Sequence, residues 1–455
     1  MKRRIPLALV SISLLIFTQL SQAQLQQSKL STEAARPVPD FFFGIQSGLP
    51  DLWPIIPVYN VRLHDTRTSW SDMNPAKGVY DWSVVDRWIA ASQKQGAGPI
   101  LYTFSQTPQW ASSNPNDQSC RYGPGECDPP DDLNPDGSGP NQHWKDFVTA
   151  LAKHAGGPNQ IRYWEMWNEP ANAFFWTGTY AQLVRMSKDA REIILSIDPK
   201  AKLLTPPDPF ILHFYQKAWK GYADAGGLQY ADIIALHGGV GTYPPQCGDY
   251  PESAEFVTVA EQLKTFLASY GVYKPIWDTE GDWGPTDKDC FTDPDLQTAF
   301  LGQYYILHRS EGIRRIFWYS YFGFSALYNP TTNQLTKAGV AYQQVHDWML
   351  GNALSNRCST QGTIWSCPFI GPNGYQAEAV WDTAETCKNG ACQTINYQVE
   401  SRFIQYRTLA GETIAVSNHQ VPIGAKPILL ENKTGQPLHA QPRSPRVPRL
   451  PDLTD

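Results

Sequence analysis

Between Asp40 and Leu350, short apolar runs alternate with longer stretches in which apolar positions repeat with helical spacing. In residues 143–155, for example, apolar side chains recur three and four positions apart, which forms one stripe for packing against a sheet. Similar stripes predict helices at Val84–Ile89, Tyr180–Leu195 and Val257–Tyr270. We predict eight strands, each followed by a helical stretch: Phe41–Gln46, Val58–His64, Pro99–Phe104, Ile161–Asn168, Ala201–Thr205, Asp232–His237, Pro275–Thr279 and Ile313–Tyr319. This pattern favours an α/β fold, a (β/α)8 TIM barrel over residues 40–350, rather than an open doubly wound sheet.

After residue 350 the pattern changes to β-type runs with no helix between them. The runs are Gly362–Cys367, Gln376–Trp381, Arg402–Arg407, Thr413–Val416 and Ile428–Leu430. They predict a small antiparallel β domain over residues 351–432, sandwich-like and packed beside the barrel. The Pro-rich residues 433–455 are expected to be a disordered tail.

The first 23 residues have the order of charges and side chains that is typical of a secretory signal peptide. Three basic residues precede an apolar run from Ile5 to Leu20, and small residues follow it up to Ala23. The run is shorter than the ~20 residues that a membrane-spanning helix needs. We therefore expect a secreted or periplasmic protein that is not anchored in a membrane, with residues 24–39 as a linker.

Eight cysteines in an exported chain favour disulfides over a metal site. Three pairs are close in sequence: 120 with 127, 358 with 367, and 387 with 392. By elimination Cys247 would pair with Cys290, although sequence alone does not prove any connectivity. The nine histidines have no zinc-binding spacing, so we expect no metal and no other cofactor.

The chain has 455 residues, of which 42% are hydrophobic, 13% aromatic and 18% charged, with a formal net charge of −6. This composition excludes a disordered or coiled-coil protein. The absence of a long basic run argues against nucleic acid and anionic membranes as partners. We expect a monomer with a neutral partner.

Two carboxylates stand where predicted strands stop. The fourth strand runs into Ile161-Arg-Tyr-Trp-Glu-Met-Trp-Asn-Glu-Pro170, and the seventh into Lys274-Pro-Ile-Trp-Asp-Thr-Glu-Gly-Asp-Trp283. In a TIM barrel the carboxyl ends of the strands form the active site, so Glu169 and Glu280 would face each other there. A carboxylate pair in this position is the apparatus of glycoside hydrolysis.

Three neighbouring carboxylates compete for these roles. At about 3.3 Å per strand residue, Glu165 would lie roughly 13 Å deeper than Glu169, and Asp278 roughly 7 Å deeper than Glu280. We expect both to be held in buried polar networks. Asp282 lies beyond its strand and could contact a substrate.

At this point the chain resembles clan A glycoside hydrolases, most of all families 39 and 5. The resemblance covers residues 40 to 350. It rests on Trp167-Asn-Glu-Pro170 and Phe174-Phe-Trp-Thr-Gly-Thr-Tyr180, together with Val61-Arg-Leu-His64, Trp70-Ser-Asp-Met-Asn-Pro-Ala-Lys-Gly-Val-Tyr-Asp-Trp82 and Thr107-Pro-Gln-Trp-Ala111.

The resemblance implies a role for several residues. Glu169 would be the acid/base and Glu280 the nucleophile, with Asn168 as a partner of the sugar 2-hydroxyl. Arg62 would help to hold the nucleophile ionised, and Trp318 would be the floor of the subsite for the attacked sugar.

One strand departs from the family pattern. Many clan members have His-x-Tyr on strand six, whereas this chain reads Ile234-Ala-Leu-His-Gly-Gly-Val-Gly-Thr-Tyr243. His237 matches, but Gly239 stands in place of the tyrosine. Tyr243 could reach the site from the loop, or the role could be absent.

Four tryptophans follow predicted strands, where their rings could stack on sugar faces: Trp110, Trp176, Trp283 and Trp318. Core packing is the alternative for each of them.

These features together predict a retaining glycosidase acting by double displacement on a neutral oligo- or polysaccharide, with a β-linkage suggested by the resemblance. Apolar neighbours such as Trp167 and the charge of Glu280 should raise the pKa of Glu169. An inactive carbohydrate-binding protein on the same barrel is the alternative. The sugar, the linkage and exo or endo action stay open.

Overall fold

The structure of the protein, a computed structural model, describes residues 35–433 apart from 48, 159, 211–212, 239–253, 284–290, 324 and 389, and for residues 213–215 it describes the backbone alone. The predictions for the signal peptide, Tyr243, the pairing of Cys247 with Cys290 and the C-terminal tail concern residues outside these ranges.

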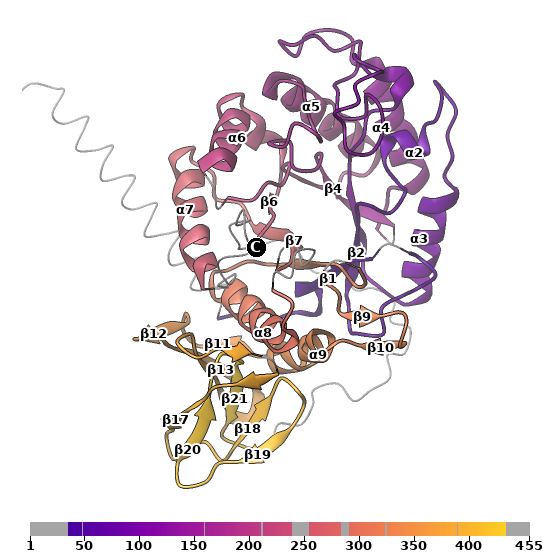
Figure 1. Cartoon of the computed structure of the whole chain (residues 1–455). Helices are drawn as coiled ribbons and strands as arrows, with labels where there is room; N and C mark the ends of the chain where they lie inside the picture. The colour runs from indigo at the N-terminus through magenta and orange to yellow at the C-terminus, as the bar shows by residue number, and fades with distance from the viewer. Residues whose placement is uncertain are drawn as a thin grey trace, which may run out of the picture.

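Eight parallel strands form one sheet in the order β5-β4-β3-β2-β1-β8-β7-β6. Parallel bridges from Leu204 to Ile233 and from Pro209 to His237 join the β5 and β6 edges, so the sheet curls into a nearly closed barrel (Figure 1). The strands are β1 (Phe43–Gln46), β2 (Asn60–Leu63), β3 (Ile100–Thr103), β4 (Ile161–Glu165), β5 (Lys202–Leu204), β6 (Ile234–Leu236), β7 (Ile276–Gly281) and β8 (Ile316–Tyr319). The predicted (β/α)8 TIM barrel is confirmed.

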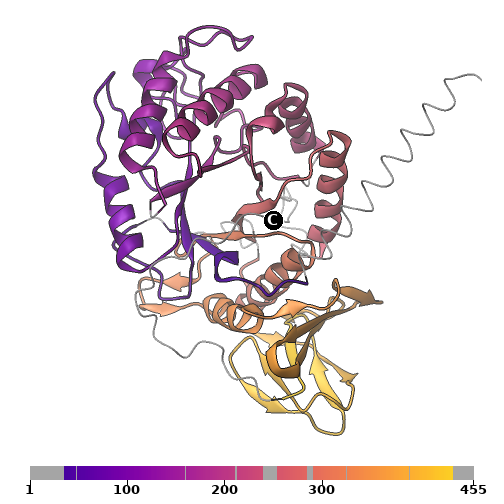
Figure 2. The same ribbon diagram turned by 180° about the vertical axis from the view of Figure 1, so that it is seen from behind.

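Helices surround this sheet, as the view from behind also shows (Figure 2). They are α2 (Trp70–Met73), α3 (Ser83–Lys94), α4 (Gln142–Ala155), α5 (Tyr180–Ile197), α6 (His213–Asp224), α7 (Glu255–Ser269), α8 (Pro294–Ser310) and α9 (Lys337–Met349). The predicted stripe on α4 is buried in full, from Trp144 to Ala152. Helix α5 begins where Thr179 and Gln182 form a reciprocal capping box, which satisfies two free backbone N–H groups.

Two local predictions are wrong. No helix joins β1 to β2 in the described part of residues 47–59, because prolines at 50, 54 and 57 interrupt any helical hydrogen bonding. The fourth strand ends at Glu165 rather than at Asn168, since Trp167 has a positive φ of 64° and cannot continue an extended strand.

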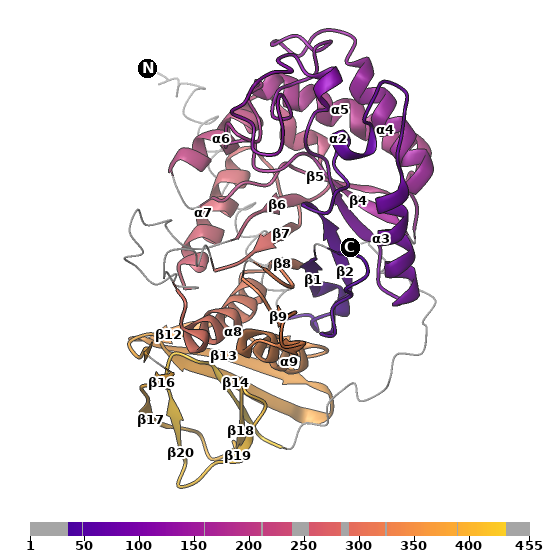
Figure 3. The ribbon, with the colours of Figure 1, turned by 45° about the vertical axis from the view of Figure 1, so that its right-hand side comes forward.

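The C-terminal strands are antiparallel, as predicted, and lie against α8 and α9 (Figure 3). The main sheet has the order β11-β13-β14-β21-β18-β19, and β12 also pairs with β13. The bounds are β11 (Ala353–Leu354), β12 (Ser359–Gln361), β13 (Ile364–Gly371), β14 (Tyr375–Asp382), β18 (Gln405–Thr408), β19 (Thr413–Ala415) and β21 (Ile428–Glu431). Short pairs are β9 (Tyr328–Asn329) with β10 (Gln334–Leu335), β15 (Cys387–Lys388) with β16 (Ala391–Cys392), and β17 (Ile395–Gln398) with β20 (Gln420–Ile423).

Three of the expected disulfides are confirmed: Cys120–Cys127, Cys358–Cys367 and Cys387–Cys392. Each closes a short local loop.

Within the described ranges, no helix has both the length and the apolar character needed to cross a membrane.

Candidate active site

Alternation along the barrel strands separates an apolar floor from a polar layer above it. The floor is a buried cluster of Leu101, Tyr163, Leu204, Ile233, Ala235, Trp277 and Phe317. Because side chains two positions apart share one face of a strand, the next inward residues toward the carboxyl ends include Thr103, Glu165, His237 and Tyr319. The polar layer therefore lies at the strand ends where an active site was expected.

Arg62, on β2, organises this layer. Its guanidinium is fully buried and donates hydrogen bonds to Glu165 at 2.9 Å, to Glu280 at 2.6 Å and to Asn168 at 2.8 Å. It also donates to Gln46, on β1, at 2.9 Å. A buried cation needs this many acceptors to offset the loss of water. Arg62 thereby joins β1, β2, β4 and β7 around one point.

The loop after β4 brings Glu169 back over the barrel. Glu169 has a positive φ of 39°, and its N–H donates to the carbonyl of Pro207 at 3.1 Å. The chain therefore turns after Glu165, and the extended-strand separation of 13 Å does not apply. Glu165 itself is 0% exposed and bound by Arg62 and Thr103, which confirms the predicted buried polar network.

A bulge on β7 directs Glu280 into the barrel mouth. Asp278 pairs with Ile316, but Gly281 pairs with Trp318. An advance of three residues along β7 therefore corresponds to an advance of two residues along β8. The extra residue breaks the simple alternation, and bulges are a common way to re-aim a side chain beside an active site. As a result Glu280 reaches Arg62, while Asp278 remains behind the strand, 0% exposed.

The two candidate carboxylates lie together and are open to solvent. One oxygen of Glu169, one of Glu280 and a ring nitrogen of His237 all lie within 4.8 Å of one another. The side chains of Glu169 and Glu280 are 19% and 16% exposed, in contrast to the fully buried Glu165. A substrate can therefore reach Glu169 and Glu280 but not Glu165.

His237 stands between these carboxylates. Its Nδ1 lies 2.7 Å from Glu169, and its Nε2 lies 3.8 Å from Glu280. Burial acts to lower the pKa of His237, but the charge of Glu280 and the contact with Glu169 outweigh it and raise the pKa to about 9. The 2.7 Å contact with the Glu169 carboxylate places the proton on Nδ1, which donates to Glu169, while Nε2 faces Arg62 at 3.3 Å.

The predicted rise in the pKa of Glu169 is wrong for the free protein. Burial does raise it, but the hydrogen bond and charge of His237, helped by His64 and Arg62, outweigh burial and hold the pKa below its ordinary value. The sequence interpretation included His237 among the site residues but did not predict its contact with Glu169.

Asp208 is a carboxylate that the sequence interpretation missed. It follows β5, is 4% exposed, and accepts a hydrogen bond from the N–H of Ala171. Burial and the charge of Glu169 raise the pKa of Asp208 well above its ordinary value. Its place directly after an apolar strand is the same signal that pointed to Glu169 and Glu280. Asn172, which donates to Glu169 at 3.0 Å, was also missed.

Three of the four predicted tryptophans are too buried to offer a sugar a ring face: Trp318, Trp283 and Trp176. Trp318 is 0% exposed and packs on Tyr304 and Tyr305 of α8, because alternation on β8 turns Phe317 and Tyr319 inward and Trp318 outward. It therefore has no open surface on which a sugar could lie.

The other three tryptophans also pack against protein. Trp283 packs against Trp318 with tilted rings, and Trp176 meets Trp167 edge-on; Trp283 and Trp176 are each 3% exposed. Trp110 is half-buried and donates to the carbonyl of Asn74. Core packing, the alternative considered for each tryptophan, describes these contacts.

Tyr319, Asp65 and Tyr122 form a further cluster at the mouth that was not predicted. Tyr122 donates to Asp65 at 2.6 Å, and Tyr319 donates to the same carboxylate at 3.3 Å. Asp65 has a positive φ of 56°, which turns the chain after β2 toward both rings. No sequence pattern singled out these contacts between loops.

Glu169, His237 and Glu280 have ligand atoms close enough to hold a metal ion. The buried guanidinium of Arg62, 2.6 Å from Glu280, already supplies a positive charge there, however. A divalent cation would be repelled by it, so the donor set fits an organic substrate better than a metal.

Comparison with solved structures shows the same fold. A family 39 glycoside hydrolase from Bacteroides cellulosilyticus WH2 matches with a TM-score of 0.62 and 17% identity, covering 88% of this chain and 81% of that one. A β-xylosidase from Caulobacter crescentus CB15 matches with a TM-score of 0.55 and 16% identity, over 87% and 97% of the chains. A family 30 xylanase from Clostridium acetobutylicum matches with a TM-score of 0.54 and 16% identity, over 88% and 97%.

At 16–17% identity these similarities concern the fold, and they agree with the TIM barrel described above. No protein-family model matches the chain, and no curated protein matches its sequence significantly.

Proposed function

We propose that the protein is a retaining glycoside hydrolase, with Glu280 as the nucleophile and Glu169 as the acid/base. The observation that carries this proposal is the spacing of the two carboxylates, with an oxygen of each within 4.8 Å of the other. Retaining enzymes hold this pair about 5–5.5 Å apart, whereas inverting enzymes leave about 6.5–9.5 Å for a water molecule. The short spacing supports direct attack on the sugar.

In the first step a carboxylate oxygen of Glu280 attacks the anomeric carbon and the glycosidic C–O bond breaks. The leaving oxygen takes a proton from Glu169. In the second step Glu169 accepts a proton from water, the water oxygen attacks the same carbon, and the bond to Glu280 breaks. Two inversions leave the product with the configuration of the substrate.

In this proposed cycle, His237 is the source of the proton that Glu169 delivers to the leaving oxygen. Nδ1 of His237 and Oε1 of Glu169 are 2.7 Å apart, so the pair holds one proton that can pass to Glu169 as the leaving oxygen becomes basic. When Glu280 becomes an ester it loses the charge that helps to raise the pKa of His237. Glu169 and His237 can then share the proton that water releases.

The substrate we propose is a neutral oligo- or polysaccharide with a β-linkage, bound without a cofactor. Asn168 accepts from Arg62 through Oδ1, which leaves its amide N–H₂ oriented for a sugar hydroxyl.

The three local disulfides support an oxidising compartment, in line with residues 1–23 as a signal peptide for secretion or export to a periplasm.

A screen of nitrophenyl glycosides followed by NMR of the first-formed product tests the proposal. We expect the released sugar to have the anomeric configuration of the substrate. An inverted product would overturn the assignment of Glu280 as nucleophile. Binding of labelled glycans without release of any product would instead favour the alternative of an inactive carbohydrate-binding protein.

A further inference from the structure

The loop that follows β5 lies against the turn that carries Glu169. The N–H of Glu169 donates to the carbonyl of Pro207 at 3.1 Å. Two positions further along, the N–H of Ala171 donates to Oδ1 of Asp208 at 3.3 Å. Two successive residues of one loop therefore hold the backbone on which Glu169 stands, one through its carbonyl and the other through its side chain.

The same loop also contacts the strand end that carries His237. Pro209 forms a parallel bridge with His237, and Nε1 of Trp219, on α6, donates to the carbonyl of Asp208 at 3.2 Å. Prolines precede and follow Asp208, and the fixed φ angle of proline restricts the backbone on both sides of it. Asp208 therefore stands on a rigid loop that contacts both members of the Glu169–His237 pair.

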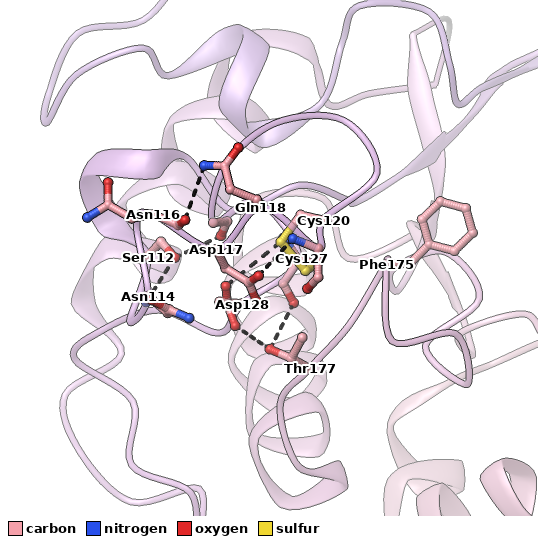
Figure 4. The surroundings of a disulfide bond; sticks show 12 residues. Ser112, Asn114, Asn116, Asp117, Gln118, Cys120, Cys127, Asp128, Phe175 and Thr177 are labelled. Atoms are coloured by element: carbon pink, nitrogen blue, oxygen red, sulfur yellow. Dashed lines mark hydrogen bonds between the residues drawn. A yellow bond between two sulfur atoms is a disulfide. The ribbon is translucent and has the colours of Figure 1, made fainter.

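The far end of the segment that carries Glu169 has an anchor of its own. The N–H of Thr177 donates to the carbonyl of Cys127 at 2.9 Å, and its hydroxyl donates to Asp128. Figure 4 shows Thr177 beside Asp128 and the disulfide Cys120–Cys127. Because this end is fixed to the loop after β3, the contacts with the loop after β5 decide where the other end, with Glu169, lies.

The carboxyl group of Asp208 lies where a negative charge is unfavourable. Asp208 is 4% exposed, and the titratable groups that interact with it in the described part of the chain include Glu169, His237 and, on α5, Tyr180. Burial and the charge of Glu169 raise the pKa of Asp208 well above its ordinary value, and these effects outweigh the opposite effect of His237. A neutral carboxyl group can accept through one oxygen and keep its proton on the other.

We propose that Asp208 is a positioning residue for the proposed acid/base: its side chain holds the turn after Glu169 in the place where Glu169 meets His237. This inference rests on the proposed function. Asp208 makes and breaks no bond to the substrate, and it acts through the N–H of Ala171. An ionised Asp208 would repel the Glu169 carboxylate that it has to hold, so the neutral form is the one that serves this role.

The test measures kcat/KM on substrates with poor and with good leaving groups, because only the poor ones need the proton of Glu169. We expect Asp208→Ala to lower kcat/KM at least about tenfold on poor leaving groups, since a catalytic group that is misplaced by about 1 Å can cost about 100-fold. The loss on nitrophenyl glycosides should be far smaller. Asp208→Asn should keep most of the activity on both, because its amide offers an acceptor oxygen and an N–H in place of the carboxyl O–H.

Asp382→Ala is the matched control for Asp208→Ala. Asp382 is 3% exposed and accepts the N–H of Ala384 at 2.9 Å, in β14 of the C-terminal sheet. This variant should lose stability but keep the ratio of kcat/KM between the two kinds of substrate. Three results would overturn the inference: no loss in Asp208→Ala, equal losses on both kinds of substrate, or a loss in Asp208→Asn as large as that in Asp208→Ala.

Failure of the proposed function has a separate signature, since then the unmodified protein cleaves no glycoside. In that case NMR of the histidine rings decides, with the signal of His237 identified by its loss in His237→Gln. We expect the midpoint of the His237 titration to move down from about 9 toward 6.5 in Asp208→Ala, because the contact with Glu169 is weakened, and to stay in place in Asp208→Asn and Asp382→Ala. The same midpoint in all three variants, or an equal shift in Asp208→Asn, excludes the positioning role.

Discussion

Nδ1 of His237 donates a 2.7 Å hydrogen bond to Glu169, and in the proposed mechanism this proton passes to Glu169. Replacement of Glu169 by Gln removes the proposed acid but keeps the size of the side chain. We expect kcat/KM to fall by about 10²–10⁴ on substrates with poor leaving groups, which is the usual contribution of a general acid, and far less on nitrophenyl substrates, whose leaving oxygen needs no proton. Steady-state kinetics on both kinds of substrate measure this difference. Equal losses would contradict the assignment of Glu169.

The pKa of His237 links the site to stability. It is about 9 in the folded protein against an ordinary 6.5, so between these values the folded state binds more protons than the unfolded state. The proton that His237 takes up on folding therefore stabilises the folded state. This stabilisation is complete below about pH 6.5 and is lost as the pH rises through about 9. Urea unfolding at a series of pH values should show it.

The matched variant for this experiment is His237→Gln, which cannot titrate. The difference in unfolding free energy between the unmodified protein and His237→Gln should shrink as the pH rises from 6.5 to 9. A difference that does not change with pH would show that His237 does not take up a proton on folding.

At the scale of the element, strand β7 positions Glu280, the proposed nucleophile, through its bulge and through Asp278. Oδ1 of Asp278 accepts the N–H of Gly238, next to His237, at 3.0 Å and the N–H of Glu280 at 3.3 Å. Its Oδ2 accepts from Tyr304 and lies 3.1 Å from Nε2 of His308, both on α8. The buried carboxylate thus fixes the backbone on which His237 and Glu280 stand.

Gly281→Ala tests this arrangement. A Cβ at Gly281 would lie 2.8 Å from the Tyr304 hydroxyl and 3.0 Å from Asp278, so the bulge must shift. We expect a loss of about 1–3 kcal/mol in stability, as for other overpacked cores, and a fall in kcat of at least about tenfold.

Gly302→Ala on α8 is the matched control for Gly281→Ala. Its Cβ would meet Leu409 at 2.7 Å, which is an equally tight contact away from the carboxylates. We expect little change in kcat and a smaller loss of stability, because the Leu409 methyl can shift and Ala favours a helix over Gly by about 1 kcal/mol. If both variants lose kcat alike, the effect comes from stability rather than from the position of Glu280.

At the scale of the whole molecule, the barrel and the C-terminal sheet share one core. A single cluster of buried apolar residues includes Trp348 and Met349 of α9 together with Phe369, Trp381 and Leu429 of the sheet. Polar contacts join the same parts, since Gln303 donates to the carbonyl of Ala425 at 2.7 Å and Lys426 pairs with Asp295 at 3.1 Å.

A chain that ends at Leu350 would expose this shared face. We expect it to melt at a clearly lower temperature than the full chain and to aggregate, because apolar area on α8 and α9 would lose its cover. Differential scanning calorimetry and light scattering measure both effects. A soluble fragment with an unchanged melting temperature would show that the C-terminal sheet is a separate unit.

The sequence by itself determined the eight barrel strands, the placement of Glu169 after the fourth strand and of Glu280 near the end of the seventh, and three local disulfides. These properties depend on residues close together in the chain, where helical and strand periodicity and short cysteine spacings act directly. Even there, the end of β4 and the missing helix before β2 needed backbone geometry to be seen.

Only the tertiary structure decided which side chains meet. Arg62 and Glu280 are 218 positions apart in the chain, His237 and Glu169 are 68 apart, and both contacts depend on closure of the barrel. One extra residue in the register of β7 against β8 directs Glu280 to the mouth, and alternation on β8 turns Trp318 toward α8. Register and closure arise from the pairing of distant strands, so a pattern along the chain leaves them undetermined.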